Sequence, residues 1–161
     1  MKLMIKQRLF TLTDNYFVYD ETGEIRYEVE QAFLTIGHQF HVYDRRADER
    51  SEEVGYIRQK LFALTPTFEI LVRGQVVGTV RKEFTLLRPR YQVDFKNWDV
   101  EGDLMGWDYR VTSNGREILS ISKEIFNWSD TYVMHYRNPA DEIPGLLLVI
   151  AIDAVNCSHN N

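Results

Sequence analysis

Large apolar side chains alternate with polar ones along most of the chain. In the segment 25–30, Ile25, Tyr27 and Val29 are separated by charged residues. Successive side chains of a β-strand point to opposite faces of a sheet, so this period of two predicts strands with one apolar face and one wet face. The same alternation recurs in four further segments, which are Phe68–Val72, Tyr91–Phe95, Trp107–Val111 and Tyr132–Tyr136.

Turn-forming residues separate these segments. Asn114-Gly115 is the strongest hairpin signal, because both residues tolerate a positive φ. Gly23 and Gly74 mark two further turns. The spacing of the turns predicts roughly ten to twelve strands, as in sandwiches and barrels. We find no linker, low-complexity tract or internal repeat, and we therefore expect one domain over residues 1–161.

The pattern changes near the C-terminus, where the segment Leu146–Ile152 is apolar without a break. Asp141 can cap the first turn of a helix, and Glu142 and Pro144 suit that turn, so we predict a helix over about residues 141–156. An extra buried strand is the alternative that the β-branched residues of the run permit. The apolar positions of the predicted helix are Leu146, Leu147, Leu148, Val149, Ile150 and Ile152.

A helix that is apolar on every side must be buried on every side. Since the rest of the chain is predicted as strands, the sequence favours a closed, largely antiparallel β-barrel curled around this helix. The acid Asp153 interrupts the apolar run. We expect it to emerge at a barrel mouth or to pair with a cation or backbone donors, because an unpaired buried charge is costly.

Composition narrows the class of protein. Of the 161 residues, 44% are hydrophobic and 27% are charged, which excludes general disorder. The net charge of -5 lacks the basic footprint of a nucleic-acid binder. The aromatic share of 13% is high, and it fits bulky residues filling the space between a wide barrel and one helix. The aromatic residues expected to face inward are Tyr27, Phe68, Tyr91, Phe95, Trp107, Tyr109, Tyr132 and Tyr136.

The cellular location is predicted from the apolar segments, which are too short or too interrupted for a secretory signal or a membrane span. Lys6 and Arg8 interrupt any secretory signal at the N-terminus, and the apolar run near the C-terminus is shorter than the roughly 20 residues that span a bilayer. The single cysteine, Cys157, allows no intrachain disulfide and suits a reducing compartment. We therefore expect a cytoplasmic protein.

Catalytic and metal-binding patterns are not found. His38 and His41 are three residues apart in a predicted strand, so they point to opposite faces and do not share an ion. Cys157 has no motif that would activate it. We expect no cofactor, no metal and no enzymatic activity. The tryptophans offer surfaces for stacking a ligand, although such residues more often belong to a core; they are Trp98, Trp107 and Trp128.

One stretch carries an excess of cations, namely Arg81, Lys82, Arg88, Arg90 and Lys96. If the residues 81–82 and 88–90 flank one turn, they gather at one end of the barrel. Such a cluster would bind a phosphorylated headgroup or a membrane surface. The simpler interpretation is a solvated hairpin whose edges stay charged.

The last sixty or so residues resemble the LURP-one-related family, whose members share the tubby C-terminal-like fold with tubby-like proteins and phospholipid scramblases. The resemblance rests on an ordered series of segments, which are Gly102-Asp103-Leu104, the strand Trp107–Ser113, the Asn114-Gly115 turn, Ile118–Glu124, Asp130–Met134 and the helix Leu146–Asp153. The N-terminal half matches only in layout, including the turn Asp20–Gly23 between two strands.

The resemblance implies a barrel of about twelve strands around a hydrophobic helix, the tubby C-terminal-like arrangement. Its motifs are not catalytic, and it implies a non-catalytic binding protein for an anionic lipid headgroup or a protein partner. Tubby-like relatives bind phosphoinositides through basic barrel residues, which is the route it suggests for the cations described above. The alternatives are an intracellular carrier of a small apolar ligand and an uncharacterised enzyme.

Overall fold

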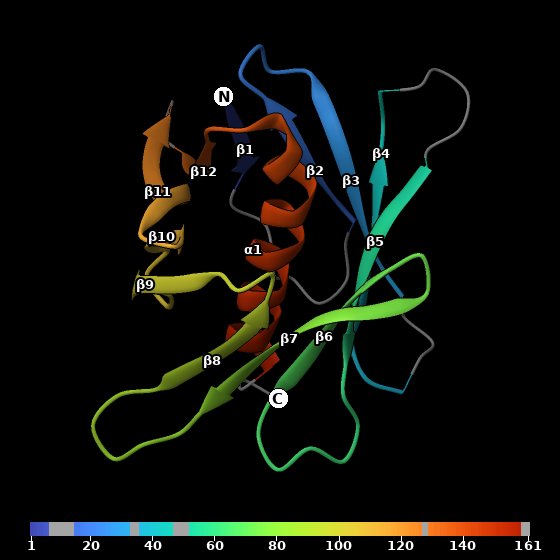
Figure 1. The fold of residues 1–161 in the computed structure, drawn as a ribbon. Helices are drawn as coiled ribbons and strands as arrows, with labels where there is room; N and C mark the ends of the chain where they lie inside the picture. The colour runs from blue at the N-terminus through green and yellow to red at the C-terminus, as the bar shows by residue number, and fades with distance from the viewer. Residues whose placement is uncertain (7–14, 33–35, 47–51, 127–128, 159–161) are drawn as a thin grey trace.

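A computed structural model of the chain describes residues 1–6, 15–32, 36–46, 52–126 and 129–158. These residues form twelve β-strands, one 3-10 turn and one α-helix (Figure 1). The strands are β1 (Lys2–Lys6), β2 (Tyr16–Asp20), β3 (Ile25–Gln31), β4 (Gln39–Asp44), β5 (Glu52–Gln59), β6 (Thr67–Val72), β7 (Gln75–Glu83), β8 (Arg90–Phe95), β9 (Asp99–Asp103), β10 (Asp108–Ser113), β11 (Arg116–Phe126) and β12 (Ser129–Tyr136).

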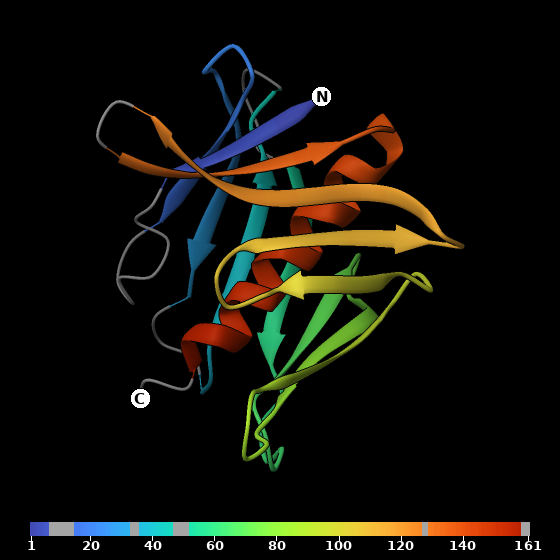
Figure 2. The same ribbon diagram turned by 90° about the vertical axis from the view of Figure 1, so that its left-hand side faces the viewer.

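The twelve strands form one antiparallel sheet that curls around the helix (Figures 1 and 2). Their order is β8-β7-β6-β5-β4-β3-β2-β1-β12-β11-β10-β9, so strands that are neighbours in sequence are neighbours in the sheet except where β1 pairs with β12. Strands β8 and β9 are the two edges of the sheet and do not pair with each other. The predicted barrel is therefore confirmed as a nearly closed one, with a seam between β8 and β9.

The central helix α1 (Glu142–Cys157) follows the 3-10 turn η1 (Pro139–Asp141). The predicted helix is confirmed with its boundaries shifted by one residue, and the strand alternative is wrong. The predicted cap is also wrong: Asp141 has helical φ and ψ and makes no side-chain cap bond. Instead, the side chain of Asn138 accepts a hydrogen bond of 3.0 Å from the Ala140 N–H and opens η1 from an extended conformation.

The core lies between α1 and the inner face of the sheet. Every residue of α1 from Gly145 to Val155 is buried. Close approach is possible because two glycines face bulky leucines: a Cβ at Gly55 would lie 2.7 Å from Leu147, and one at Gly145 would lie 2.5 Å from Leu119. Any larger side chain at either position would push the helix away from the sheet.

Most of the aromatic side chains predicted to face inward are buried, as in the case of Tyr27 and Phe68. Tyr91 is an exception, because it lies half-buried beside the seam. Ile25 also departs from the predicted alternation and is 44% exposed at the start of β3. Trp107 precedes β10 rather than opening it, with a φ of 59°, and its ring stacks on Tyr132 at 4.0 Å.

Candidate functional site

The most exposed large apolar side chains lie on three connections between strands. These connections join β3 to β4, β5 to β6 and β7 to β8, and their described residues 36–38, 60–66 and 84–89 lie at the end of the barrel where α1 terminates (Figure 1). The side chains concerned are at least 82% exposed, and they are Ile36, Phe62, Leu64, Leu86 and Leu87. We call this set of connections the loop end.

Backbone hydrogen bonds hold these connections together. The Lys60 N–H donates to the Thr67 carbonyl at 2.8 Å, and the Lys82 N–H donates to the Pro66 carbonyl at 3.0 Å. The register that pairs Thr67 with Arg81 places the segments 60–66 and 84–89 at neighbouring strand ends. The connection containing Ile36 adjoins them, since the Gln59 N–H donates to the His38 carbonyl at 2.8 Å.

The charge of the loop end is positive. The segments 60–66 and 84–89 contain Lys60 and Arg88 and no acidic residue. Arg90, also exposed, follows directly at the start of β8. The Thr85 hydroxyl donates to the Arg88 carbonyl, which shapes the hairpin that presents Leu86 and Leu87. Exposed apolar tips and cations are thus combined on the same loops.

The five cations that the sequence grouped together are divided by the structure. Arg81, Arg88 and Arg90 lie on the outside of the hairpin β7–β8. Lys82 is buried and points inward, with its Nζ 3.5 Å from the Asn156 side chain. The predicted single cluster is wrong at this position because adjacent strand residues face opposite sides of a sheet.

Lys96, the fifth cation, lies beyond the other end of β8, where its Nζ is 5.5 Å from the centre of the Trp98 ring. It is therefore separated from the loop end by the length of the strand.

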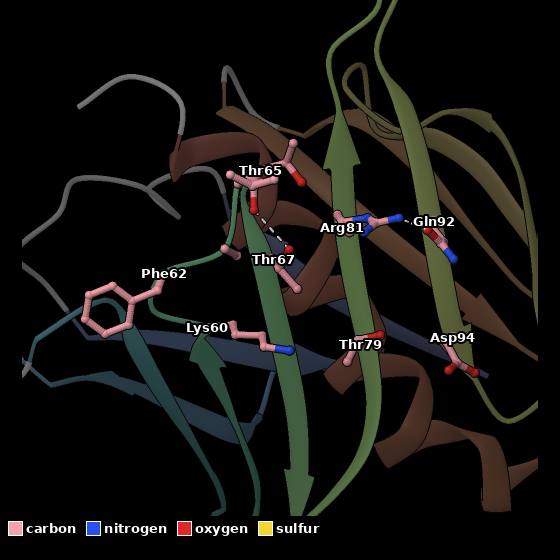
Figure 3. Close-up of a pocket in the computed structure, with 10 residues that line it drawn as sticks. Lys60, Phe62, Thr65, Thr67, Thr79, Arg81, Gln92 and Asp94 are labelled. Atoms are coloured by element: carbon pink, nitrogen blue, oxygen red, sulfur yellow. Dashed lines mark hydrogen bonds between the residues drawn. The ribbon is translucent and has the colours of Figure 1, made fainter.

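A groove lies beside the loop end on the outer face of β6, β7 and β8 (Figure 3). Its volume is about 420 Å³. The lining is polar along the strands and apolar along the connection β5–β6, and it consists of Lys60, Phe62, Ala63, Leu64, Thr65, Thr67, Thr79, Arg81, Gln92 and Asp94. We call it the β6–β8 groove.

Strand register arranges the polar lining in two rows. Thr67, Arg81 and Gln92 are cross-strand partners in the row nearer the loop end. Thr79 and Asp94 are partners in the next row. Lys60 and Asp94 are both exposed. Neither has an ion-pair partner among the described residues. Opposite charges therefore face the groove without neutralising each other.

Arg81 is only partly satisfied in this groove. Its Nη2 donates to the Glu83 carboxylate at 2.7 Å and to the Gln92 side-chain oxygen. Its Nε is buried and has no hydrogen-bond partner among the described residues. The guanidinium therefore lines the groove with its charge already paired to Glu83.

A second, smaller cleft is apolar and lies near the start of α1. It measures about 290 Å³ and is lined by Val54, Val72, Val77, Phe95, Lys96, Ile143, Pro144 and Leu147. Since α1 occupies the barrel interior, this cleft lies beside the helix rather than along the barrel axis. It falls at the small end of the range for ligand sites.

Buried polar groups lie at both ends of α1. At the start of the helix, Glu142 accepts hydrogen bonds from the hydroxyls of Tyr27 and Tyr136 and pairs with the Arg26 Nε at 3.2 Å. Burial alone would raise the pKa of Glu142, but these hydrogen bonds and the Arg26 charge outweigh it and lower the pKa. The carboxylate is therefore held ionised.

At the other end, Asp153 is 3% exposed, and its Oδ2 has no hydrogen-bond partner. Burial raises the pKa of Asp153 well above its usual value, opposed only by a hydrogen bond from Trp107. The expectation that Asp153 reaches a barrel mouth or pairs with a cation or backbone donors is wrong, because it is buried and its hydrogen bond comes from the Trp107 side chain. The apolar run of α1 extends past this position to Val155, which keeps the acid inside the core.

Asn156, one turn further on, links the two edges of the sheet. Its Oδ1 accepts a hydrogen bond from the Tyr91 hydroxyl of β8, and its Nδ2 donates to the Leu104 carbonyl beyond β9 at 3.0 Å. Burial raises the pKa of Tyr91 to about 12. The seam is thus bridged by helix side chains where strand pairing is missing.

The histidines and the cysteine have ordinary structural surroundings. His41 stacks on Tyr56 at 4.8 Å and pairs with Glu53 at 2.8 Å, and His38 lies 3.3 Å from the Gln31 amide. Burial raises the pKa of the Cys157 thiol to about 12. Within the described ranges, no group of three or more His, Cys, Asp or Glu side chains is placed to hold a metal ion. Trp128 lies outside the described residues.

Two apolar runs between predicted strands indicate the loop end in the sequence, although they do not follow the period-two alternation. Leu61-Phe62-Ala63-Leu64 and Phe84-Thr85-Leu86-Leu87 are apolar runs that lie between strands and end near a proline. Apolar residues in turn segments have no core to enter, so they indicate a contact surface. The helix α1 does not reach the length and sustained hydropathy of a membrane-crossing helix, and no other described helix does.

Comparisons with known proteins agree with this architecture. The chain is 27% identical over 155 residues to the uncharacterized protein YxjI of Bacillus subtilis (strain 168), covering 96% of this chain and 93% of that protein. The solved structure of the Arabidopsis thaliana protein AT5G01750 has the same fold, with a TM-score of 0.62 at 14% identity, covering 94% of this chain and 89% of that one. A profile of the LURP-one-related family matches residues 1–153, and the chain therefore belongs to the LURP-one-related family.

Proposed function

We propose that this protein is a non-catalytic barrel that docks on anionic membrane surfaces through its loop end. The observation that carries the proposal is the exposure of Phe62, Leu64, Leu86 and Leu87 on loops that also carry cations. Burial of apolar surface contributes roughly 25 cal/mol of free energy per Å², and these exposed side chains do not gain it in water. Insertion of the tips into the boundary between headgroups and acyl chains recovers that stabilisation.

Electrostatic attraction supplies the second part of the binding free energy. Each cation near an anionic leaflet contributes about 1 kcal/mol. Lys60, Arg88 and Arg90 stand beside the apolar tips, so insertion brings all three to the headgroups. Stable docking of soluble domains takes two such signals acting together. A cytoplasmic location, expected from the sequence, stays a prediction.

A fluid membrane suits this surface better than a folded protein partner does. The apolar side chains are distributed over three connections, and each is at least 82% exposed. Headgroups rearrange around protruding loops, whereas a protein partner must supply a matching hollow for each. The alternative of an apolar-ligand carrier is disfavoured because α1 fills the barrel interior.

Vesicle flotation tests the proposal. We expect the protein to float with phosphatidylcholine vesicles that contain phosphatidylglycerol, and to float less as salt is raised. Leu86→Ser combined with Leu87→Ser, and separately Arg88→Glu combined with Arg90→Glu, should each weaken binding by about tenfold or more. Val76→Ser and Arg116→Glu are the matched controls, because both residues are exposed and lie away from the loop end.

Failure of the protein to float at low salt would overturn the proposal. Flotation that neither pair of loop-end substitutions changes would overturn it as well, because binding would then use another surface. Circular dichroism of each variant checks that the barrel is still folded before binding is compared.

A further inference from the structure

We infer that the β6–β8 groove binds the headgroup of an aminophospholipid, with the phosphate held by Arg81 and Lys60 and the ammonium held by Asp94. This inference rests on the proposed docking and adds to it the class of lipid recognised. Its basis is that the groove presents both signs of charge in a fixed arrangement (Figure 3).

The phosphate end of the site consists of cations and hydroxyls. Arg81 projects from the middle strand of the groove, and Lys60 approaches from the connection β5–β6. Arg81 already donates through Nη2 to the Glu83 carboxylate and to Gln92, and its side chain lines the groove, so a phosphate seated there would share this cation with Glu83. Thr65 and Thr67 line the same space, and the Thr67 hydroxyl donates to the Thr65 carbonyl at 3.0 Å.

Asp94 distinguishes between phosphate-bearing ligands. A ligand that carried only a phosphate would be repelled by this carboxylate. The neighbouring acid Glu69 is already paired with Arg58 at 2.6 Å, and Asp94 has no such partner within the described part of the chain. A ligand that also carries an ammonium group gains an ion pair at this position.

The direction of the groove matches the direction of an aminophospholipid. In such a lipid the phosphate adjoins the acyl chains through glycerol, and the amine is the outermost group. Arg81 lies in the row nearer the apolar tips, opposite Gln92. Asp94 is two residues beyond Gln92 on β8, which makes it a diagonal neighbour of Arg81 at about 7–8 Å. A lipid whose acyl chains lie at the loop end therefore reaches Arg81 with its phosphate and Asp94 with its amine.

Matched vesicles test this inference. Phosphatidylserine and phosphatidylglycerol carry the same net charge, but only phosphatidylserine has an amine. At equal mole fractions in phosphatidylcholine, we expect about threefold tighter flotation with phosphatidylserine, the effect of one exposed ion pair. Asp94→Asn should remove this preference and leave phosphatidylglycerol binding in place. Asp99→Asn, an exposed acid on β9 outside the groove, should keep the preference.

Soluble headgroups separate this inference from the proposed docking. Addition of glycerophosphoserine should shift amide resonances of Thr79, Arg81 and Asp94, and glycerophosphoglycerol should shift them less. Equal flotation with both lipids, or a preference that survives Asp94→Asn, overturns the inference and leaves docking intact. If neither vesicle recruits the protein, docking is overturned, and the titration alone then decides: selective shifts in the groove support the site, and their absence overturns it.

Discussion

An acid is buried near each end of helix α1, and the surroundings shift the pKa values of the two acids in opposite directions. Glu142, in the first turn, receives two tyrosine hydroxyls and the Arg26 guanidinium, which lower its pKa. Asp153, near the last turn, receives one hydrogen bond from Trp107, and burial raises its pKa. The first acid is an anchor whose charged form is favoured, and the second is a core acid whose charged form is disfavoured.

Helix polarity and the available partners explain the difference. The N-terminus of a helix carries a partial positive charge that favours Glu142, whereas the C-terminus carries a partial negative charge that disfavours ionised Asp153. The last turn of α1 contains no basic residue. The comparison teaches that burial alone does not decide the charge of a carboxyl; the donors that the surrounding strands supply decide it.

Removal of the anchoring acid should have the largest effect. Glu142→Ala leaves two buried tyrosine hydroxyls and Arg26 without their acceptor, so we expect the free energy of unfolding to fall by about 3 kcal/mol. Urea unfolding at neutral pH measures this change. Glu101→Ala, which breaks an exposed pair with Arg110, should cost less than about 1 kcal/mol. Equal losses in the two variants would contradict the assignment of Glu142 as an anchor.

Replacement of the second acid should have a smaller effect of opposite sign. Burial raises the pKa of Asp153, so ionisation of this side chain opposes folding as the pH rises, and Asp153→Asn should raise the free energy of unfolding at pH 7. The raised pKa means that the Asp153 contribution is fully present below about pH 4 and is lost as the pH rises.

The two acids therefore have opposite pH signatures. The Glu142 contribution is present above about pH 4.3 and is lost as the pH falls through its lowered folded pKa. Urea unfolding of the wild type and both variants between pH 3 and pH 7 separates these effects. A stability difference between wild type and Asp153→Asn that did not change with pH would contradict a raised Asp153 pKa.

The smallest change concerns the reactivity of Cys157 at the same end of α1. Burial raises its thiol pKa to about 12, with Asp153 adding to the rise and Lys82 opposing it. The thiolate fraction at pH 8 is then about a thousandfold below that of a free cysteine. We expect iodoacetamide to label the folded protein at least about 100-fold more slowly than the urea-unfolded protein. Similar rates in the two states would show that this end of the helix is open to solvent.

Much of the fold could be predicted from local patterns. Alternation at Tyr27 and Phe68 identified inward faces, and the run Leu146–Ile152 required a helix enclosed on all sides. Both predictions depend on the hydrophobic effect acting on residues near one another in sequence. Such patterns need no knowledge of which strands become neighbours.

Other features depended on contacts between distant segments. Lys82 was grouped with Arg81 by sequence, yet the pleat of β7 turns one inward and the other outward. Asp141 has the chemistry of a cap, but its helical backbone conformation leaves that role to Asn138. In both cases the chemistry of the residue allowed two roles, and the local backbone conformation decided which of them the residue has.

The sequence by itself determined a β-rich chain with one buried helix, because hydrophobic periodicity is a local property. Only the tertiary structure decided that the barrel leaves a seam between β8 and β9, that the pKa of Glu142 is lowered while that of Asp153 is raised, and that apolar tips and cations share one end. These features depend on strand register and on donors supplied from more than a hundred residues away, such as Tyr27 for Glu142. The local sequence pattern does not indicate which distant residues become neighbours.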